Sequence, residues 1–309
     1  MKGEIRVFAP ATVANVASGF DIFGFALEMP GDEVIARLSE HPGVTMAKVS
    51  GDGGVLSLDP KKNTAGVSVL KLLEFLNCDH GVELELHKKM PLGSGLGSSA
   101  ASAAGSVFAV NALLGSPLTS KELIPFAMEA ERIACGSAHA DNVAPSLLGG
   151  FILVRSYQPL DIVEIPINLN LYCSVLHPKI EIRTESARQI LRKEISLNQM
   201  VIQSGNAAGL IAGLFSGDAS LIGRSLNDVV VEPVRARLIP GFYDIQSAAL
   251  YAGALGCSIS GSGPSVFALT QKKSQAENVG EAMVSACRAK GLDCNLYVSS
   301  INKKGPRIL

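Results

Sequence analysis

The segment PLGSGLGSSAAS, residues 91–102, restricts the possible folds of this chain more than any other feature. Its three glycines occupy alternate positions, and two serines and a run of alanines follow them. Glycine lets backbone amides approach a ligand closely, but its freedom in the unfolded chain makes it costly to order. Such a turn therefore serves either close packing alone or the binding of a ligand through the backbone.

The loop lies between a predicted strand and a predicted helix. The strand GVELELHKK alternates Val82, Leu84 and Leu86 on one face, and apolar residues recur at helical spacing after the loop. A helix N-terminus presents unpaired amides and a partial positive charge, which suits phosphate. No lysine follows the glycines as in a Walker A motif, and their two-and-two spacing differs from the dinucleotide fingerprint. Hydroxyls at Ser98 and Ser99 favour phosphate or magnesium binding over a turn that serves packing alone.

A second unusual residue is Glu131, on a helix that begins at the Thr119/Glu122 capping box and runs to about residue 134. The apolar stripe of this helix consists of Leu123, Ala127, Ala130 and Ala134. Glu131 lies at the edge of that stripe, and a carboxylate that faces a core is costly unless it is paired or binds a metal. A salt bridge would be the ordinary explanation. Together with a phosphate loop, however, Mg²⁺ is the better one.

Composition excludes several classes of partner. The chain has 309 residues with a net charge of −1, so it offers no electrostatic basis for binding nucleic acid or an anionic membrane. Its most apolar stretch, residues 100–115, is shorter than the roughly 20 residues of a membrane span. The N-terminus is a poor signal peptide, and the six cysteines form no CxxC pair. We expect a cytoplasmic protein with reduced thiols.

The order of strand and helix patterns indicates an α+β protein of two domains. We place the boundary near residue 165, in the non-periodic segment SYQPLDIVEIPINLN, and so predict domains 1–165 and 166–309. Predicted strands cover residues 4–10, 33–40, 81–89, 149–156, 171–178 and 294–298, and the segment CSISGSGPSVFALT, residues 257–270, precedes the last helix and strand. Predicted helices cover 63–77, 100–114, 119–134, 197–227, 243–252 and 276–290, with shorter ones from Asn142 and Thr184. A cleft between two domains is a common ligand site.

With APATVANVASGFDIFGFAL near the N-terminus and SISGSGPSVFAL near the C-terminus, the chain resembles the GHMP kinase superfamily over nearly its whole length. PLGSGLGSSAA matches the phosphate loop of that superfamily. The segments AHADNVAPSLLGGF, IRTESAR and VVEPVRARLIPG resemble its branch that phosphorylates homoserine. The resemblance implies an N-terminal ribosomal-S5-like domain and a C-terminal ferredoxin-like α/β sandwich. One departure is VANVASGFD, residues 13–21, where the family usually reads close to SANLGPGFD.

The resemblance also implies an ATP- and Mg²⁺-dependent kinase of threonine biosynthesis that takes L-homoserine as its small-molecule substrate and forms a homodimer. Asn63 would lie near the adenine, and the phosphates would bind Pro91, Leu92, Gly93, Ser94, Gly95, Leu96, Gly97, Ser98, Ser99, Ala100 and Ala101. Ser99 and Glu131 would hold Mg²⁺, and Thr184 would lie by the γ-phosphate. The homoserine pocket would comprise Asn15, Asp21, His139, Asn142, Arg188, Arg235, Gly261 and Ser262.

The chemistry of homoserine agrees with these positions. Its ammonium group needs an anion such as Asp21, and its carboxylate suits the planar guanidinium groups of Arg188 and Arg235. Singly, each of these residues is more often a surface charge or a turn cap, so their joint occurrence carries the inference. Asn142 is expected to orient the hydroxyl, with late proton loss and no strong base. Asp141 is the alternative, as a general base.

Two other functions remain open at this point. Another kinase of the superfamily, acting on mevalonate or a diphosphocytidyl-methylerythritol, would not need the acid–arginine set. A catalytically silent member that senses ATP should lack a magnesium ligand or a loop residue, and this sequence keeps both.

Overall fold

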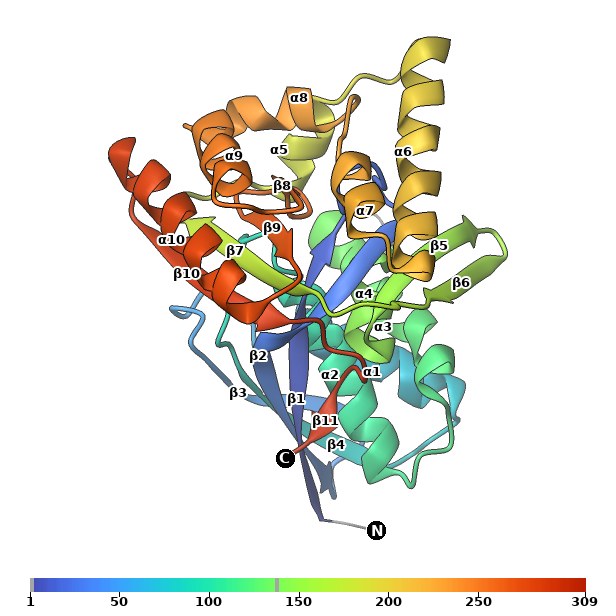
Figure 1. The fold of residues 1–309 in the computed structure, drawn as a ribbon. Helices are drawn as coiled ribbons and strands as arrows, with labels where there is room; N and C mark the ends of the chain where they lie inside the picture. Colours follow the sequence, from blue (N-terminus) through green and yellow to red (C-terminus); the bar gives the residue numbers. More distant parts are fainter. Residues whose placement is uncertain (1–2, 137–138) are drawn as a thin grey trace.

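The structure is a computed structural model that describes residues 3–136 and 139–309, without the side chains of residues 133–135. Two β-sheets and the helices packed on them form the fold (Figure 1). The seven-stranded sheet has the order β11-β1-β2-β4-β3, and β2 also pairs with β5, which pairs with β6. Its strands are β1 (Glu4–Ala14), β2 (Phe23–Ser39), β3 (Val44–Ser50), β4 (Gly81–His87), β5 (Phe151–Tyr157), β6 (Leu160–Ile165) and β11 (Arg307–Ile308).

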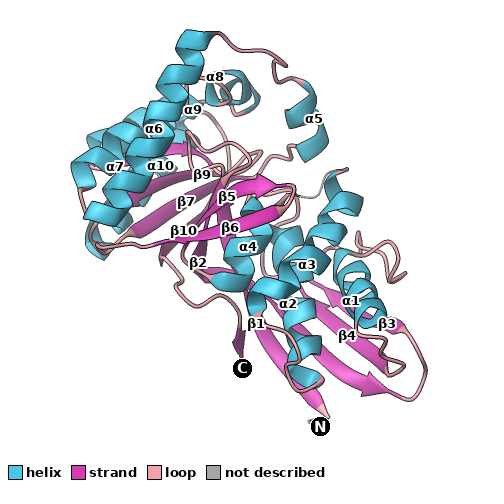
Figure 2. Cartoon of the chain, turned by 90° about the vertical axis from the view of Figure 1, so that its right-hand side faces the viewer, coloured by secondary structure: helices cyan, strands magenta, loops and turns pink. Residues whose placement is uncertain are grey.

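Four helices pack together against one face of this sheet, as Figure 2 shows: α1 (Thr64–Phe75), α2 (Ser98–Leu113), α3 (Ser120–Cys135) and α4 (Ala140–Leu148). The central helix α2 consists mainly of small residues, which allow it to lie close to the strands. A Cβ added at Gly105 would lie 2.8 Å from the Cβ of Ala9. Because α2 begins at the glycine loop, this packing fixes the position of the loop's last residues.

The second sheet is antiparallel and has the order β10-β7-β9-β8. Its strands are β7 (Tyr172–Pro178), β8 (Gly256–Ile259), β9 (Val266–Thr270) and β10 (Cys294–Ser300). Packed on it or beside it are α5 (Thr184–Gln189), α6 (Leu197–Ser216), α7 (Ala219–Ser225), α8 (Glu232–Arg235), the 3-10 helix η1 (Ala236–Leu238), α9 (Phe242–Tyr251) and α10 (Lys273–Ala289). The helix α6 stands along one side of this half (Figure 1).

Three hydrophobic clusters hold these layers together. One lies between the large sheet and α1–α4, and another between the small sheet, α9 and α10. The third joins the two halves of the molecule and includes Phe25, Phe151 and Phe267. The ring of Phe25 stacks on Phe151 at 4.5 Å between centroids and meets Phe267 edge-on at 6.0 Å. Because these rings come from β2, β5 and β9, the packing of the two halves is fixed by buried aromatic contacts.

The α+β two-domain prediction is confirmed, while several local predictions are wrong. The segment after Tyr157 is not irregular: β6 pairs with β5 in an antiparallel hairpin. The predicted helix 197–227 is two helices, because Gly217 takes a left-handed φ of 74° and Asp218 caps α7. β3, β11 and the first half of β2 were not predicted. The division at residue 165 remains a proposal, and β11 returns from the second half to pair with β1.

Two further observations concern the expected class of protein. None of the helices in the described ranges is long and apolar enough to cross a membrane. The five cysteines described with side chains are free thiols: Cys78, Cys173, Cys257, Cys287 and Cys294. The side chain of Cys135, and Ala138 of the quoted segment 138–151, lie outside the described residues.

Candidate active site

A cleft of about 490 Å³ lies between the glycine loop, the start of α4, α5 and the turn between β8 and β9. It gathers most of the predicted site residues from both halves of the chain: Asn15, Asp21, Asn63, Leu92, Gly93, Ser94, Gly95, Gly97, Ser98, Ser99, Glu131, His139, Asp141, Asn142, Thr184, Arg188, Arg235, Gly261 and Ser262. The remaining four, Pro91, Leu96, Ala100 and Ala101, are not among its lining residues. Leu96, Ala100 and Ala101 are fully buried and support the loop from behind.

The glycines of the loop are required both for conformation and for close contact. Gly93, Gly95 and Gly97 all have positive φ, between 61° and 75°. A Cβ at Gly95 would lie 2.5 Å from the carbonyl oxygen of Ser260, and one at Gly97 would lie 2.0 Å from Thr12 Oγ1. The loop is therefore packed against the second half of the molecule at Gly95, and its residues also line the cleft.

A buried ion pair fixes both ends of the loop. Asp32 Oδ1 accepts hydrogen bonds from the backbone N–H groups of Lys89 and Met90, at 2.7 and 3.1 Å. Asp32 Oδ2 pairs with Lys88, whose ammonium also donates to the Ser98 carbonyl and the Ser102 hydroxyl, both at 2.8 Å. Sequence reasoning missed Lys88, although it continues the inward-facing series Val82, Leu84, Leu86 of β4. A lysine at an inward position was the available signal.

The opposite end of the cleft is built on a strained loop between β1 and β2. Asn15, Val16, Ala17 and Asp21 all have positive φ, and a β-branched residue such as Val16 rarely adopts it. Asn15 holds the loop, because Nδ2 donates to the Gly261 carbonyl at 2.8 Å and Oδ1 accepts from the Asp21 amide at 3.0 Å. Strain of this kind is found where neighbouring contacts enforce a functional geometry.

Two arginines meet Asp21 and Phe20 at this end. Arg188 forms a two-pronged ion pair with Asp21, at 2.9 and 2.8 Å. Arg235 is 2% exposed and donates to the carbonyls of Gly261 at 2.9 Å and Ala187 at 3.3 Å. Both guanidinium groups lie over the ring of Phe20, at 5.1 and 5.2 Å from its centroid. Burial, and then the charge of Arg188, lower the pKa of Arg235 to about 10, so it stays cationic at neutral pH.

Asp141 is a buried acid close to the Asp21–Arg188 ion pair. Burial first, and then the charges of Asp21 and Glu131, raise the pKa of Asp141 to about 7. Burial lowers the pKa of His139, so its imidazole is neutral at pH 7, and its Nδ1 lies 3.8 Å from Asp21.

Sequence reasoning also missed Tyr157, whose hydroxyl donates to the Asp21 carbonyl at 2.8 Å. Nothing in the sequence around Tyr157 distinguished it from other strand residues.

Polar groups suited to a reacting hydroxyl lie between the loop and the arginines. Asn142 Oδ1 accepts from Thr12 Oγ1 at 2.7 Å, which leaves its amide N–H groups to face a substrate oxygen. Thr184 lies 3.3 Å from Ser262, hydroxyl to hydroxyl. Asn142 thus comes from the first half of the chain and Thr184 from the second, and both line the cleft.

The donor set near the loop suits phosphate and magnesium. The Ser94 hydroxyl is buried, and in the described part of the chain it has no hydrogen-bond partner. Ser99, in the first turn of α2, and Glu131, on α3 and 7% exposed, both line the cleft. A hydroxyl, one carboxylate and phosphate oxygens are the donors that Mg²⁺ prefers. Asn63 lines the far end, but its amide is engaged with Ala65 N and the Ser57 carbonyl.

Comparison with known proteins finds the same two-part organisation. Residues 63–150 match the N-terminal domain model of GHMP kinases, and residues 210–289 match the C-terminal one. Homoserine kinases of Chloroherpeton thalassium and Chlorobaculum tepidum are each 53% identical to this chain, and the alignments cover 97–99% of each chain.

Solved structures give the same answer at the level of the fold. The crystal structure of a homoserine kinase from Cytophaga hutchinsonii has 56% identity and a TM-score of 0.97, covering 100% of this chain and 98% of the other. A mevalonate kinase of L. major has a TM-score of 0.76, 16% identity and coverage of 98% and 97%, and shares the fold alone.

Proposed function

This chain belongs to the GHMP kinase family, and from that premise we propose how its cleft works. It is an ATP-dependent kinase with the activity of its homoserine kinase relatives, and it transfers the γ-phosphate to the side-chain hydroxyl of L-homoserine. The products are O-phospho-L-homoserine and ADP, on the route to threonine. The observation that carries the assignment is the presence, in one cleft, of a glycine phosphate loop and the Asp21–Arg188–Arg235 group.

The charge balance of the pocket fits an amino-acid zwitterion. Asp21 and Arg188 neutralise each other in the structure through two hydrogen bonds. A zwitterion that enters between them gives Asp21 an ammonium partner and gives Arg188 and Arg235 a carboxylate. Each charge keeps an opposite partner, so none is left buried and unpaired. A substrate with only a carboxylate, such as mevalonate, would leave Asp21 without a cation.

The phosphoryl transfer step needs positioning and charge stabilisation more than covalent chemistry. The loop amides from Gly93 to Ser99 hold the ATP phosphates, and Thr184 stabilises charge on the transferred group. The Asn142 amide orients the substrate hydroxyl, and the proton leaves late, to water or a phosphate oxygen. Ser99 and Glu131 would hold Mg²⁺, which would supply charge neutralisation at the phosphates.

We also propose that the protein is a homodimer joined through α6. This helix has 20 residues and no charged side chain, and it keeps apolar residues in solvent: Leu197 is 77% exposed, Val201 63% and Phe215 61%. Small residues, Ser204 and Ala208, lie between them at helical spacing, so a second copy of α6 could pack closely. An exposed apolar surface of this kind marks an interaction site. Dimerisation through it would bury no charge.

The free thiols and the small-molecule chemistry support a cytoplasmic location, which we keep as a proposal.

A direct test of the charge argument compares L-homoserine with 4-hydroxybutyrate, which has the hydroxyl and carboxylate but lacks the amino group. We expect the wild-type enzyme to prefer L-homoserine by at least about a hundredfold in kcat/KM, because 4-hydroxybutyrate leaves Asp21 unpaired. In Asp21→Asn this preference should collapse, chiefly through a higher KM for L-homoserine. An unchanged preference in the variant would remove Asp21 from ammonium recognition.

A further inference from the structure

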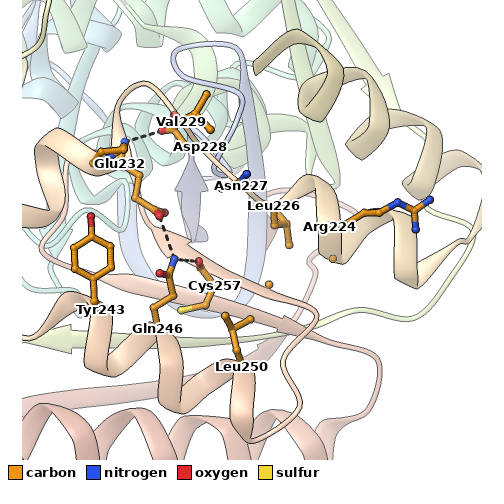
Figure 3. A pocket seen from close by; sticks show the side chains of 13 residues that line it. Arg224, Leu226, Asn227, Asp228, Val229, Glu232, Tyr243, Gln246, Leu250 and Cys257 are labelled. Carbon is orange, nitrogen blue, oxygen red and sulfur yellow. Dashed lines mark hydrogen bonds between the residues drawn. The ribbon is translucent and has the colours of Figure 1, made fainter. Parts of the chain in front are cut away.

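A pocket of about 590 Å³ opens on the outer side of the helix that carries Arg235 (Figure 3). Its lining comes from α7, the segment before α8, α8 itself, α9 and β8. The feature that needs explanation is Glu232, which is only 9% exposed at its floor. Burial raises the pKa of Glu232 to about 7, so an acid here is costly at neutral pH. Among the described residues, the groups that act on this carboxyl are Ser258, Gln246 and Asp228, and none of these is basic.

The side-chain hydrogen bonds of Glu232 join α8 to neighbouring elements. Its carboxylate accepts from the Ser258 hydroxyl on β8 and from Gln246 Nε2 on α9, the latter at 3.1 Å. Gln246 Nε2 also donates to the Cys257 carbonyl at 2.8 Å, so α8, α9 and β8 share one polar junction. Figure 3 shows the Glu232 carboxylate directed at the Gln246 amide, which in turn meets Cys257.

A second contact joins α8 to the same strand–turn segment one helical turn further along the helix, inside the active cleft. Arg235 follows Glu232 by three residues, and Gly261 follows Ser258 by three. Arg235 donates to the Gly261 carbonyl at 2.9 Å, so α8 and the strand–turn segment 258–261 are joined by two parallel contacts. One contact lies in the outer pocket and the other in the substrate cleft. A displacement of α8 would therefore change both contacts.

The start of α8 is fixed by a second carboxylate. Asp228 accepts hydrogen bonds from the backbone N–H groups of Val230, Val231 and Glu232, at 2.8 to 2.9 Å. It also accepts from Gln203 Nε2 at 2.9 Å, and the same amide donates to the Ser18 carbonyl at 3.1 Å. The helix that carries Arg235 is thereby connected to the loop that carries Asp21.

We propose that Glu232 is a positioning residue for substrate recognition: through Ser258 and Gln246 it fixes α8, and thereby holds the Arg235 guanidinium at the site of the L-homoserine carboxylate. The proposal rests on the role of Arg235 given above. Glu232 touches neither substrate, so its removal should act on homoserine binding and leave the ATP end of the cleft unchanged.

The test measures steady-state kinetics of Glu232→Leu, Glu232→Gln and Ser258→Ala. Loss of the junction should raise the KM for L-homoserine roughly five- to tenfold in Glu232→Leu and Ser258→Ala. An effect of this size is typical of a residue that influences binding through a neighbouring residue and does not touch the ligand itself. The KM for ATP and kcat should stay within about twofold, because the hydrogen bonds of the junction join Glu232 to Ser258 and Gln246 and include no residue of the glycine loop. Glu232→Gln can keep both contacts, because its amide oxygen can accept from Gln246 Nε2 while its NH2 donates to the Ser258 hydroxyl oxygen, and it should restore a nearly wild-type KM.

A matched control is Ser174→Ala. Ser174 is also a fully buried serine of the small sheet, and its hydroxyl donates to the Ala276 carbonyl at 2.6 Å, away from the cleft. The Ser174→Ala variant should lower thermal stability about as much as Ser258→Ala does, but it should leave the KM for L-homoserine and the KM for ATP unchanged. The proposal is overturned if Ser258→Ala behaves like this control, or if the KM for ATP rises equally. Absence of wild-type turnover of L-homoserine would instead contradict the proposed function.

Discussion

At the scale of single residues, this molecule keeps several ionisable groups at buried positions around one cleft. Asp141 is 4% exposed, Glu131 7% and Arg235 2%. Each such group carries a desolvation cost that a structural role alone does not justify. Their convergence on one cavity is therefore stronger evidence for function than any single residue.

Asp141 tests whether a base is needed. Asp141→Asn keeps the shape of the side chain and removes its ability to take a proton. The base-free account expects kcat to fall no more than about tenfold, since general base catalysis contributes ~10²–10⁴-fold where it operates. Loss of turnover with both KM values unchanged would contradict this account and make Asp141 the general base.

The same substitution has a pH-dependent effect on stability. Because burial raises the pKa of Asp141 in the folded state to about 7, above the ordinary value of 3.8, the folded state binds more protons between these two pH values. Wild-type stability therefore falls as pH rises from about 4 to 7 through this group. Asp141→Asn should therefore have a higher free energy of unfolding than wild type at pH 8, and this difference should be smallest near pH 4. Urea unfolding at both values, with Ser174→Ala as a reference, measures this; an equal effect at both pH values would count against it.

At the scale of elements, the sequence predicted regular segments well and their ends and joins poorly. The Thr119/Glu122 capping box is present as expected, and α1, α2 and α9 lie within two residues of their predicted bounds. The short strands β3 and β11 lack an alternating pattern that distinguishes them, since their stability comes from pairing with β4 and β1. Most site residues were predicted because their motif is contiguous. Lys88, Thr12 and Tyr157 were missed because their roles depend on contacts between distant segments.

The β1–β2 loop provides a prediction at this scale. Ala17 takes the place of the glycine that the family pattern has, and its φ is 59°. A left-handed residue with a Cβ is strained by roughly 1–2 kcal/mol, which glycine relieves at a smaller entropic cost. Ala17→Gly should therefore stabilise the fold by up to about 1 kcal/mol in urea unfolding. The matched change Gly97→Ala, at φ 65°, should destabilise it, because the new Cβ meets Thr12. Equal effects of the two changes would refute this strain argument.

At the scale of the whole molecule, two sheets from different parts of the chain hold the glycine-loop end and the arginine end of one cleft in fixed relation. The aromatic contact of Phe25, Phe151 and Phe267 joins them, and the packing of Gly95 against Ser260 continues that contact to the site. Such a relation between segments 240 residues or so apart is not visible in local sequence pattern. It was reached from the sequence only through the family resemblance.

The proposed dimer is a property of the same scale. Val201→Lys places a charge in the middle of the exposed apolar face of α6 and should convert a dimer into a monomer in sedimentation velocity. Glu194→Lys, in the charged segment that precedes the helix, is the control and should leave the dimer intact. A wild-type monomer at micromolar concentration would contradict the α6 interface.

The most direct measurement of the central claim is ADP release from MgATP in the presence of L-homoserine, beside D-homoserine, L-serine, L-threonine and mevalonate. The cleft described above predicts release with L-homoserine far above that with every other compound, and O-phospho-L-homoserine as the product. ATP binding without release for any of them would contradict the account, and would leave the glycine loop as a nucleotide site that performs no transfer.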